Sequence, residues 1–319
     1  MDNKIAVILP VYNEEGAIHE HFKEIRAQMI SDGIEAHFLF VDDGSKDGTW
    51  DELCRIAEEY ENIEAVKFSR NFGKEMAIRA GLSSIDADYY VVMDSDLQHP
   101  PRHIAPMIAL MKEKQVDIVN GKKASRGKEG LVYKFFARSF YGLMHSLSGV
   151  DMRGTSDFKV FSKKVAEEIR KFGEQGGFFR GFIDWVGFSC VDYHFDVEER
   201  RAGKTSFSFG KLVRLAIGAI VGYSSKPLML TIYIGTVFLG FAMLLGIHTL
   251  VNFFTGHAIS GFSTVILLQL IIGSCVLICL GLIGIYVAKI YEEVKGRPPY
   301  ILEKRIESAS REKRPVSEE

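Results

Sequence analysis

The sequence predicts an α/β fold in which helices cover a mostly parallel sheet, followed by interfacial amphipathic helices and a two-helix transmembrane hairpin. Over residues 5–119, short apolar runs alternate with segments of helical periodicity, the pattern of a parallel sheet. Residues 228–254 and 262–288 contain no Lys, Arg, Asp or Glu. A helix spans a bilayer with about 20 apolar residues, so both segments are long enough to cross.

The elements of the α/β part are assigned from the spacing of apolar residues. Strands are short apolar runs ended by Pro, Gly or Asp, and helices place apolar residues three or four apart. In chain order we expect a strand at 5–9, a helix at 14–30, a strand at 37–41, a helix at 49–60, a strand at 63–68, a helix at 76–82, and strands at 89–93 and 116–119.

Composition excludes several classes of protein. The formal net charge of the 319 residues is −2, so no basic field favours nucleic acid. The four cysteines form no C-x-x-C pair, which argues against a zinc site or a disulfide framework. Because residues 1–4 lead directly into a strand, we expect no cleaved signal peptide.

The distribution of basic residues predicts how the hairpin is oriented. Lys and Arg are frequent before residue 228 and after residue 288, whereas the connection 255–261 has only His257. The positive-inside rule then places both termini in the cytoplasm. Residues 131–147 and 207–223 mix aromatic and basic residues and are expected to lie in the headgroup plane, the second more than the first; the alternative is core helices with snorkelling basic side chains. The expected divisions are 1–206, 207–227, 228–288 and a tail at 289–319.

Carboxylates gather where the expected strands end. Asp94 and Asp96 follow the strand at 89–93, and the D-x-D pair continues to Gln98. Two acids at this spacing can reach one ligand and one metal ion together, and hard oxygen ligands favour Mg²⁺ or Mn²⁺. A cation held there would neutralise a diphosphate leaving group. The alternative is an ordinary turn, in which Asp is common.

Two further groups of residues fit a nucleoside. Asp42 and Asp43 end the strand at 37–41 and could accept hydrogen bonds from a base or a ribose, or could simply form a turn. Pro10, Tyr12 and Glu14 offer an aromatic face and a carboxylate at the end of the first strand. Ligands bind at this edge of open α/β sheets, and no G-x-G-x-x-G is present to indicate a dinucleotide.

These motifs resemble family 2 glycosyltransferases of the Rossmann-like GT-A fold. The resemblance is carried by residues 10–15, 41–49, 69–81 and 94–101, and those at 153–159 and 199–206 are similar to the branch that includes dolichyl-phosphate mannosyltransferase. Lys226-Pro227 before the two spans, and the closing 285–300, most resemble bacterial polyprenyl-phosphate (bactoprenol) glucosyltransferases. The resemblance covers nearly the whole chain apart from the tail.

The resemblance implies a role for each matching residue. It implies a catalytic domain over 1–206, with Asp94, Asp96 and Asp157 as the catalytic residues and Asp96 and Gln98 as ligands of Mg²⁺ or Mn²⁺. Asp157 would sit beneath the sugar, as a base or as an orienting group; the alternative is an acid capping a helix over 163–172. The implied donor-binding residues are Pro10, Tyr12, Glu14, Asp42, Asp43, Asp94, Arg200 and Ser206.

Candidates for the acceptor-phosphate site are Lys123, Arg126 and Arg138. The family commonly has Arg shortly after the Gly at position 121, where this chain has Lys122-Lys123. A lysine gives a point charge rather than a bidentate fork, so the choice among the three stays open. The acceptor is itself an anion, because a phosphate monoester has a second pKa of about 6. A strong general base is therefore not required.

The implied function is inverting transfer of a hexose, glucose from UDP-glucose, to polyprenyl phosphate for cell-envelope or protein glycosylation. The alternatives are mannose transfer from GDP-mannose, transfer to a glycan hydroxyl, a processive polysaccharide synthase, and a non-catalytic membrane scaffold. The Q-x-x-R-W signature of processive synthases is not matched around Trp185. The expected partners are a nucleotide-sugar, the lipid and a membrane, and a homo-oligomer stays open.

Overall fold

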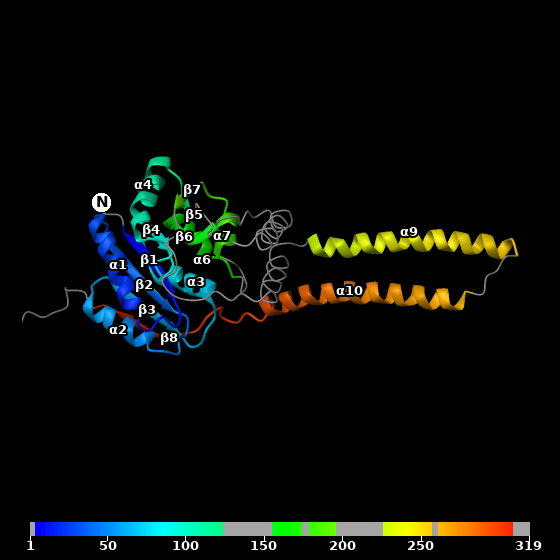
Figure 1. Ribbon diagram of the computed structural model, residues 1–319, viewed down its shortest axis with the longest axis horizontal. Helices are drawn as coiled ribbons and strands as arrows, with labels where there is room; N and C mark the ends of the chain where they lie inside the picture. Colours follow the sequence, from blue (N-terminus) through cyan, green and yellow to red (C-terminus); the bar gives the residue numbers. More distant parts are fainter. Residues whose placement is uncertain (1–3, 124–154, 174–178, 196–225, 257–260, 309–319) are drawn as a thin grey trace, which may run out of the picture. The chain divides into compact units, whose positions relative to one another are not determined.

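The computed structural model describes residues 4–123, 155–173, 179–195, 226–256 and 261–308 (Figure 1). The chain divides into two compact units. One consists of Met1–Tyr141, Val150–Thr205 and Pro298–Glu319, and the other of Gly142–Gly149 and Ser206–Arg297. The expected interfacial segments at 131–147 and 207–223 lie outside the described residues.

Eight strands of the first unit form one sheet, in the order β7-β5-β6-β4-β1-β2-β3-β8. The four strands β4, β1, β2 and β3 are parallel neighbours, and β5 is parallel to β7, whereas β6 and β8 run antiparallel to their partners. The strands are β1 (Ile5–Val11), β2 (Ala36–Asp42), β3 (Ile63–Phe68), β4 (Tyr89–Val92), β5 (Ile118–Lys123), β6 (Thr155–Ser162), β7 (Cys190–Phe195) and β8 (Leu302–Glu307).

Helices cover both faces of this sheet. Side chains alternate between the two faces along each central strand, and both faces are apolar, so each needs a covering layer. In β1, Val7 and Leu9 pack with α1, α2 and α4, while Ala6 and Ile8 pack with α3, α6 and α7. The predicted α/β class with a covered, mostly parallel sheet is thereby confirmed. The helices are α1 (Ile18–Ser31), α2 (Thr49–Glu59), α3 (Lys74–Ser84), the 3₁₀ turn η1 (Pro101–His103), α4 (Ile104–Lys114), α6 (Lys163–Arg170) and α7 (Phe179–Trp185).

Several element boundaries differ from the expected ones by a few residues, and two of these differences have a clear local reason. The helix expected from residue 14 begins at Ile18, because Asn13 and Gly16 have φ of 52° and 81° and turn the chain first. The strand expected from residue 116 begins at Ile118. Gln115, with φ of 51°, ends α4 in the left-handed region, and Val116 N–H still bonds to Met111 O.

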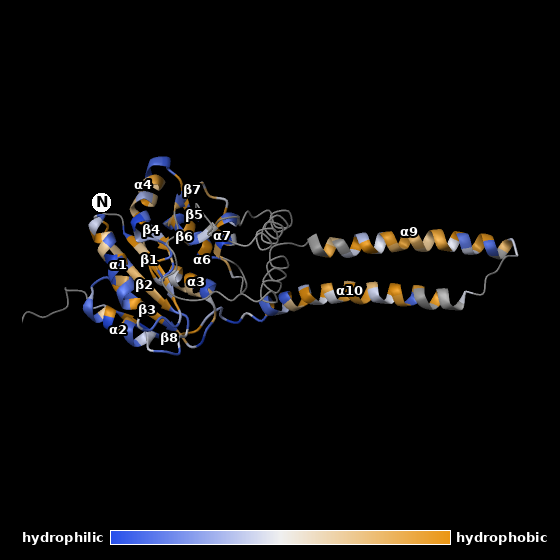
Figure 2. Cartoon of the chain, viewed as in Figure 1, coloured by the Kyte–Doolittle hydropathy of each residue, from blue (hydrophilic) through white to orange (hydrophobic). Residues whose placement is uncertain are grey.

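The second unit contains two long apolar helices, α9 (Lys226–Phe254) and α10 (Phe262–Val294), at the positions where spans are expected (Figure 2). Within them, Thr231–Asn252 and Leu268–Val294 have mean hydropathies of 2.0 and 2.7 and bury none of their residues in the protein. Apolar helices of this length without a protein core to cover them have the length and composition to cross a membrane.

The C-terminal strand β8 was not expected. It lies inside the stretch 289–319 that was expected to be a tail, and it pairs antiparallel with β3 at the edge of the sheet. Its sequence, LEKRIE, is charged and largely exposed, so no apolar run marks it. The first unit is therefore completed by residues that follow the apolar hairpin in the chain.

Candidate functional site

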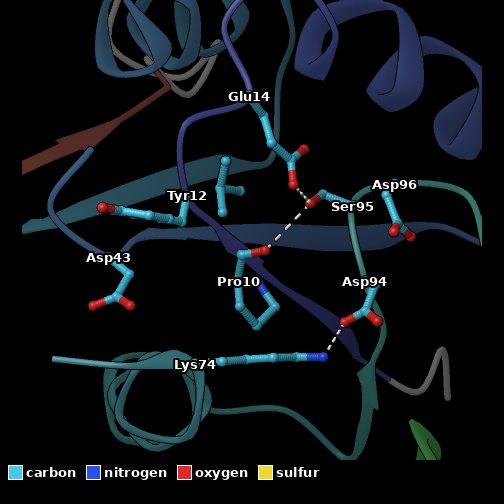
Figure 3. A pocket seen from close by; sticks show the side chains of 9 residues that line it. Pro10, Tyr12, Glu14, Asp43, Lys74, Asp94, Ser95 and Asp96 are labelled. Carbon is cyan, nitrogen blue, oxygen red and sulfur yellow. Dashed lines mark hydrogen bonds and ion pairs between the residues drawn. The ribbon is translucent and has the colours of Figure 1, made fainter. Parts of the chain in front are cut away.

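A pocket opens where β1, β2 and β4 end (Figure 3). Parallel strands bring their carboxyl ends to one edge of a sheet, which is how residues far apart in the chain meet here. Its lining consists of Pro10, Val11, Tyr12, Glu14, Asp43, Lys74, Asp94, Ser95 and Asp96. The sequence-predicted residues Pro10, Tyr12, Glu14, Asp43, Asp94 and Asp96 are thus brought together.

The loop after β1 is fixed against the loop after β2. Asn13 takes a left-handed conformation, its N–H donates to Ser45 Oγ at 2.9 Å, and its own Oδ1 accepts from Lys46 N–H at 3.0 Å. Asn tolerates this region better than most residues. The turn leaves Tyr12 44% exposed at the pocket, so its ring offers a free face to an aromatic ligand.

The two adjacent acids after β2 have different surroundings. Asp43 lines the pocket and accepts from Phe72 N–H at 2.7 Å and from Gly73 N–H at 2.9 Å. Burial raises the pKa of Asp43 above its ordinary value, against the effect of these donors. Asp42 is fully buried, accepts from Ser45 N–H at 2.8 Å and does not line the pocket. Asp42 therefore holds the turn that presents Asp43.

Glu14 is partly buried, and one of its two carboxylate oxygens already accepts a hydrogen bond. Ser95 Oγ donates to Glu14 Oε1 at 2.6 Å and lies 3.3 Å from Pro10 O (Figure 3). The other oxygen, Oε2, is buried and has no partner among the described residues. Burial raises the pKa of Glu14 to about 7, although the Ser95 hydrogen bond opposes this. A buried oxygen without a partner is costly, and a ligand hydroxyl would satisfy it.

The D-x-D turn is held from below by His99. Asp94 N–H donates to His99 Nδ1 at 3.2 Å, and the His99 ring stacks on Phe158 with centroids 5.2 Å apart. Leu97 takes a φ of 59°, uncommon for such a residue and typical of functional turns, and Gln98 N–H donates to Asp96 Oδ1 at 3.1 Å. The turn thereby points the Asp96 carboxylate into the pocket, whereas Gln98 is not part of the lining.

The pocket carboxylates fit a metal site whose ligands come partly from the protein and partly from the substrate, rather than one formed by protein side chains alone. Among the described residues, no cluster of three or more His, Cys, Asp or Glu side chains could hold a metal by itself. Mg²⁺ typically binds through one or two carboxylates together with substrate phosphates and water. Asp96 is partly exposed, and its Oδ1 accepts the Gln98 N–H hydrogen bond, which leaves Oδ2 to face a cation. It therefore matches that donor set.

An ion-pair network extends the pocket beyond the predicted residues. Lys74, the first residue of α3, contacts Asp94 Oδ1 and Asp157 Oδ2, the latter at 2.7 Å. Arg180 Nε donates to Asp157 Oδ1 at 2.6 Å. Asp157 lies within β6 and does not cap α6, so the helix-capping alternative is wrong. Lys74 and Arg180 were not singled out from the sequence. Arg180 is marked only by its charge within the apolar stretch 178–183, and Lys74 has no local signal.

Glu75 is a second partly buried acid of this region, and it gives a pH prediction. It accepts from Phe179 N–H at 2.6 Å, and burial raises its pKa to about 7 from 4.5. The folded state therefore keeps its proton between about pH 4.5 and 7 while the unfolded state loses it, so stability falls as pH rises through that window. Over this pH window, the free energy of unfolding should therefore fall by about 1–3 kcal/mol less in Glu75→Gln than in the wild type, as measured by thermal unfolding.

The matched control is Glu20→Gln, which changes an exposed acid on α1. Its melting temperature should follow that of the wild type from pH 5 to pH 8. Parallel curves for Glu75→Gln and the wild type would contradict the assignment to Glu75.

The remaining predicted residues are the acceptor-phosphate candidates and the two donor-binding residues after position 195. Arg126, Arg138, Arg200 and Ser206 are outside the described residues. Lys123 ends β5, and its side chain is not described. The neighbouring Lys122 pairs with Asp192 at 2.7 Å.

Comparison with known proteins agrees with this geometry. Residues 6–170 match the model of glycosyl transferase family 2. The chain is 36% identical over 301 residues to the uncharacterized glycosyltransferase YkcC of Bacillus subtilis, covering 94% of this chain and 93% of that protein. It is 32% identical over 303 residues to a prophage-derived bactoprenol glucosyl transferase of Shigella flexneri, covering 94% and 98%.

A similarity to a solved structure was also found. Glucosyl-3-phosphoglycerate synthase of Mycobacterium tuberculosis aligns with a TM-score of 0.48 at 20% identity, covering 69% of this chain and 76% of that one. The family assignment rests on the sequence matches: the family model covers residues 6–170, and each of the two relatives matches over 94% of the chain. With its strand-edge pocket and D-x-D turn, this chain belongs to glycosyl transferase family 2.

Proposed function

We propose that this enzyme transfers glucose from UDP-glucose to polyprenyl phosphate, with inversion at the anomeric carbon. The observation that carries the proposal is the combination, in one chain, of a pocket rich in carboxylates and two exposed apolar helices. Relatives with the name bactoprenol glucosyl transferase match over nearly their whole length, which supports a lipid acceptor. The charge flanking the helices favours a cytoplasmic catalytic unit and cytoplasmic termini.

The lining residues suit the parts of a nucleotide-sugar. The exposed Tyr12 ring offers a stacking face for the base, Asp43 can accept from a base N–H, and the unpartnered Glu14 oxygen can accept from a ribose hydroxyl. Asp96 would hold a divalent cation. When bound, that cation would neutralise charge developing on the leaving diphosphate.

A phosphate acceptor reduces what the protein must supply. A lipid monophosphate is largely a dianion at neutral pH, so it attacks without losing a proton to a base. The work of the protein is then to hold donor and acceptor in line and to exclude competing water.

Product formation tests the proposal directly. Purified full-length protein is incubated with Mn²⁺ or Mg²⁺, undecaprenyl phosphate and one nucleotide-sugar at a time. The lipid products are identified by mass spectrometry. A hexosyl-phosphate lipid from UDP-glucose is the expected result. Product only from GDP-mannose would replace the proposed donor, and product only on a glycan hydroxyl would replace the proposed acceptor.

The basic segment after β5 gives a prediction about the acceptor. Lys123, Arg126 and Arg138 are replaced singly by Ala. A buried charge-assisted contact to phosphate is worth about 1.5–3 kcal/mol, or ten- to a hundredfold, whereas attraction to an anionic surface is worth about 1 kcal/mol and is screened by salt. Replacing the residue that binds the acceptor phosphate should therefore raise the lipid KM about tenfold or more. The increase should not depend on salt concentration, and donor affinity should be unchanged.

The control is Lys122→Ala, because Lys122 is already paired with Asp192. If the lipid KM of all three variants instead rises only a few-fold, and only at low salt, the segment docks to the membrane. The residue that binds the acceptor phosphate then lies elsewhere, and Arg200 and Arg201 are the next candidates.

A further inference from the structure

Lys74 brings a positive charge into a pocket whose other charged lining residues, within the described part of the chain, are all acids. It is the only Lys or Arg among the described lining residues, and its ammonium lies between Asp94 and Asp157. Arg180 contacts the far oxygen of Asp157, so two cations and two anions alternate through the network. The Lys74 ammonium has three N–H donors, and within the described part of the chain two of them are taken by these carboxylates.

Asp157 is poorly placed to accept a proton from a substrate. Its side chain is only 7% exposed, and it is not among the residues that line the pocket. One oxygen accepts from Lys74 and the other from Arg180. Burial alone would raise the pKa of Asp157, but the Arg180 hydrogen bond and the Lys74 charge hold it well below its ordinary range. Among the described residues that line the pocket, Lys74 is the one that contacts Asp157, so it links Asp157 to a substrate there.

The charge balance indicates what Lys74 contacts. A phosphate beside Lys74 would also lie beside Asp94, and the positive charge is already neutralised by two carboxylates. A neutral polyhydroxyl group meets no such repulsion. It can receive a hydrogen bond from the remaining ammonium N–H and donate one to Asp94, which also lines the pocket.

We propose that Lys74 donates a hydrogen bond to a hydroxyl of the transferred hexose, and that Asp157 is a positioning residue that holds the Lys74 ammonium in place. This rests on the proposed function, since it assigns the sugar part of the donor to a subsite formed by Lys74 and Asp94. It also separates this subsite from the nucleoside contacts at Tyr12, Glu14 and Asp43.

Donor binding without any acceptor tests the contact. The full-length protein, with Mn²⁺, is titrated with UDP and with UDP-glucose by calorimetry, for the wild type, Lys74→Gln and Lys74→Arg. A charged donor to a neutral hydroxyl is worth about tenfold or more in affinity. Lys74→Gln should therefore weaken UDP-glucose at least about tenfold more than UDP, and Lys74→Arg, which keeps the charge and the donors, should recover part of the loss.

A double-mutant cycle tests the role of Asp157. If Asp157 acts through Lys74, Asp157→Asn weakens UDP-glucose relative to UDP, and adding it to Lys74→Gln changes the affinity ratio by much less than the product of the two single effects. A general base would behave differently, because its loss lowers kcat and leaves UDP-glucose binding unchanged.

The matched control is Lys163→Gln, which breaks a lysine–carboxylate pair of similar length, 2.6 Å to Asp86, outside the pocket. It should leave both affinities unchanged. The proposal is overturned if Lys74→Gln weakens UDP and UDP-glucose equally, which would place Lys74 on the diphosphate, or if only the lipid KM rises, which would place it on the acceptor. A wild type that binds UDP-glucose but forms no glucosyl lipid would refute the proposed function and leave the Lys74 contact standing.

Discussion

Asp96→Ala should lower glycosyl transfer by about 10²–10⁴-fold, because it removes the pocket carboxylate that would bind the cation at the diphosphate. Stabilisation of leaving-group charge by a metal is worth several kcal/mol, and each 1.4 kcal/mol is tenfold in rate. The D-x-D turn itself should survive, since Asp94 N–H is held by His99 and Leu97 keeps its backbone conformation. The readouts are the transfer rate and the dependence of UDP affinity on Mn²⁺ concentration.

A matched control for this variant is Asp51→Ala, which removes an exposed acid in the first turn of α2. That variant should retain its rate and its metal dependence. An Asp96→Ala enzyme that is fully active and still metal-dependent would show that the metal is held by other residues.

The sequence could predict this part of the site because its signals are local. Asp94 and Asp96 directly follow an apolar strand, and Pro10, Tyr12 and Asp43 occupy the same place after neighbouring strands. Parallel pairing of β1 with β2 and with β4 then brings these residues to one edge.

The ion-pair network could not be predicted in this way. Lys74 and Asp157 are separated by 83 positions in the chain, and their contact depends on how α3 and β6 are packed. Nothing in the local spacing distinguishes Lys74 from a solvated lysine at the start of a helix. For the same reason Asp42 and Asp43 looked equivalent in the sequence, although only one of them lines the pocket.

Three strands were not expected, β6, β7 and β8, and the last two share a physical cause. The two strands β7 and β8 lie at the edges of the sheet, where one side of the strand has no neighbour. Their residues are mostly exposed or partly exposed, so alternation rather than an apolar run would mark them. Strand β8 is also separated from β3 by the apolar hairpin, so only the folded chain reveals the pairing.

The pairing of β8 connects the C-terminal segment to the pocket at the strand edge. Tyr300 stacks on Phe68 with ring centroids 5.0 Å apart, and Phe68 meets Phe72 edge-on at 5.6 Å. Ser69 N–H donates to Ile301 O at 3.0 Å, and Phe72 N–H donates to the Asp43 carboxylate. The loop between Phe68 and Gly73 is thus held by the C-terminal segment on one side and holds Asp43 on the other.

A chain that ends at Arg297 should therefore lose most of its stability and its UDP affinity, although every lining residue is still present. The deletion removes the backbone hydrogen bonds between β8 and β3, each worth about 0.5–1.5 kcal/mol, and leaves the buried Glu64 without Arg305, which lies 2.8 Å away and is itself 54% exposed. It also exposes the edge of β3 and the Phe68 ring. Total stabilities of domains are about 5–15 kcal/mol, so the loss is a large share. The same loss would affect a chain cut before the apolar helices, which is why the anchor must be tested by replacing α9 and α10 and keeping β8.

Tyr300→Ala tests the coupling without deleting the strand, and Tyr300→Phe is its matched control, because it keeps the stacked ring. Loss of a half-buried aromatic ring should cost about 1–3 kcal/mol of stability, below the 3–5 kcal/mol of a fully buried one. Because the ring supports the loop that orders Asp43, UDP affinity should fall as well, and Tyr300→Phe should retain both. The measurements are thermal unfolding and UDP titration of the three proteins. A Tyr300→Ala protein with a lower melting temperature but wild-type UDP affinity would show that β8 stabilises the sheet without shaping the pocket.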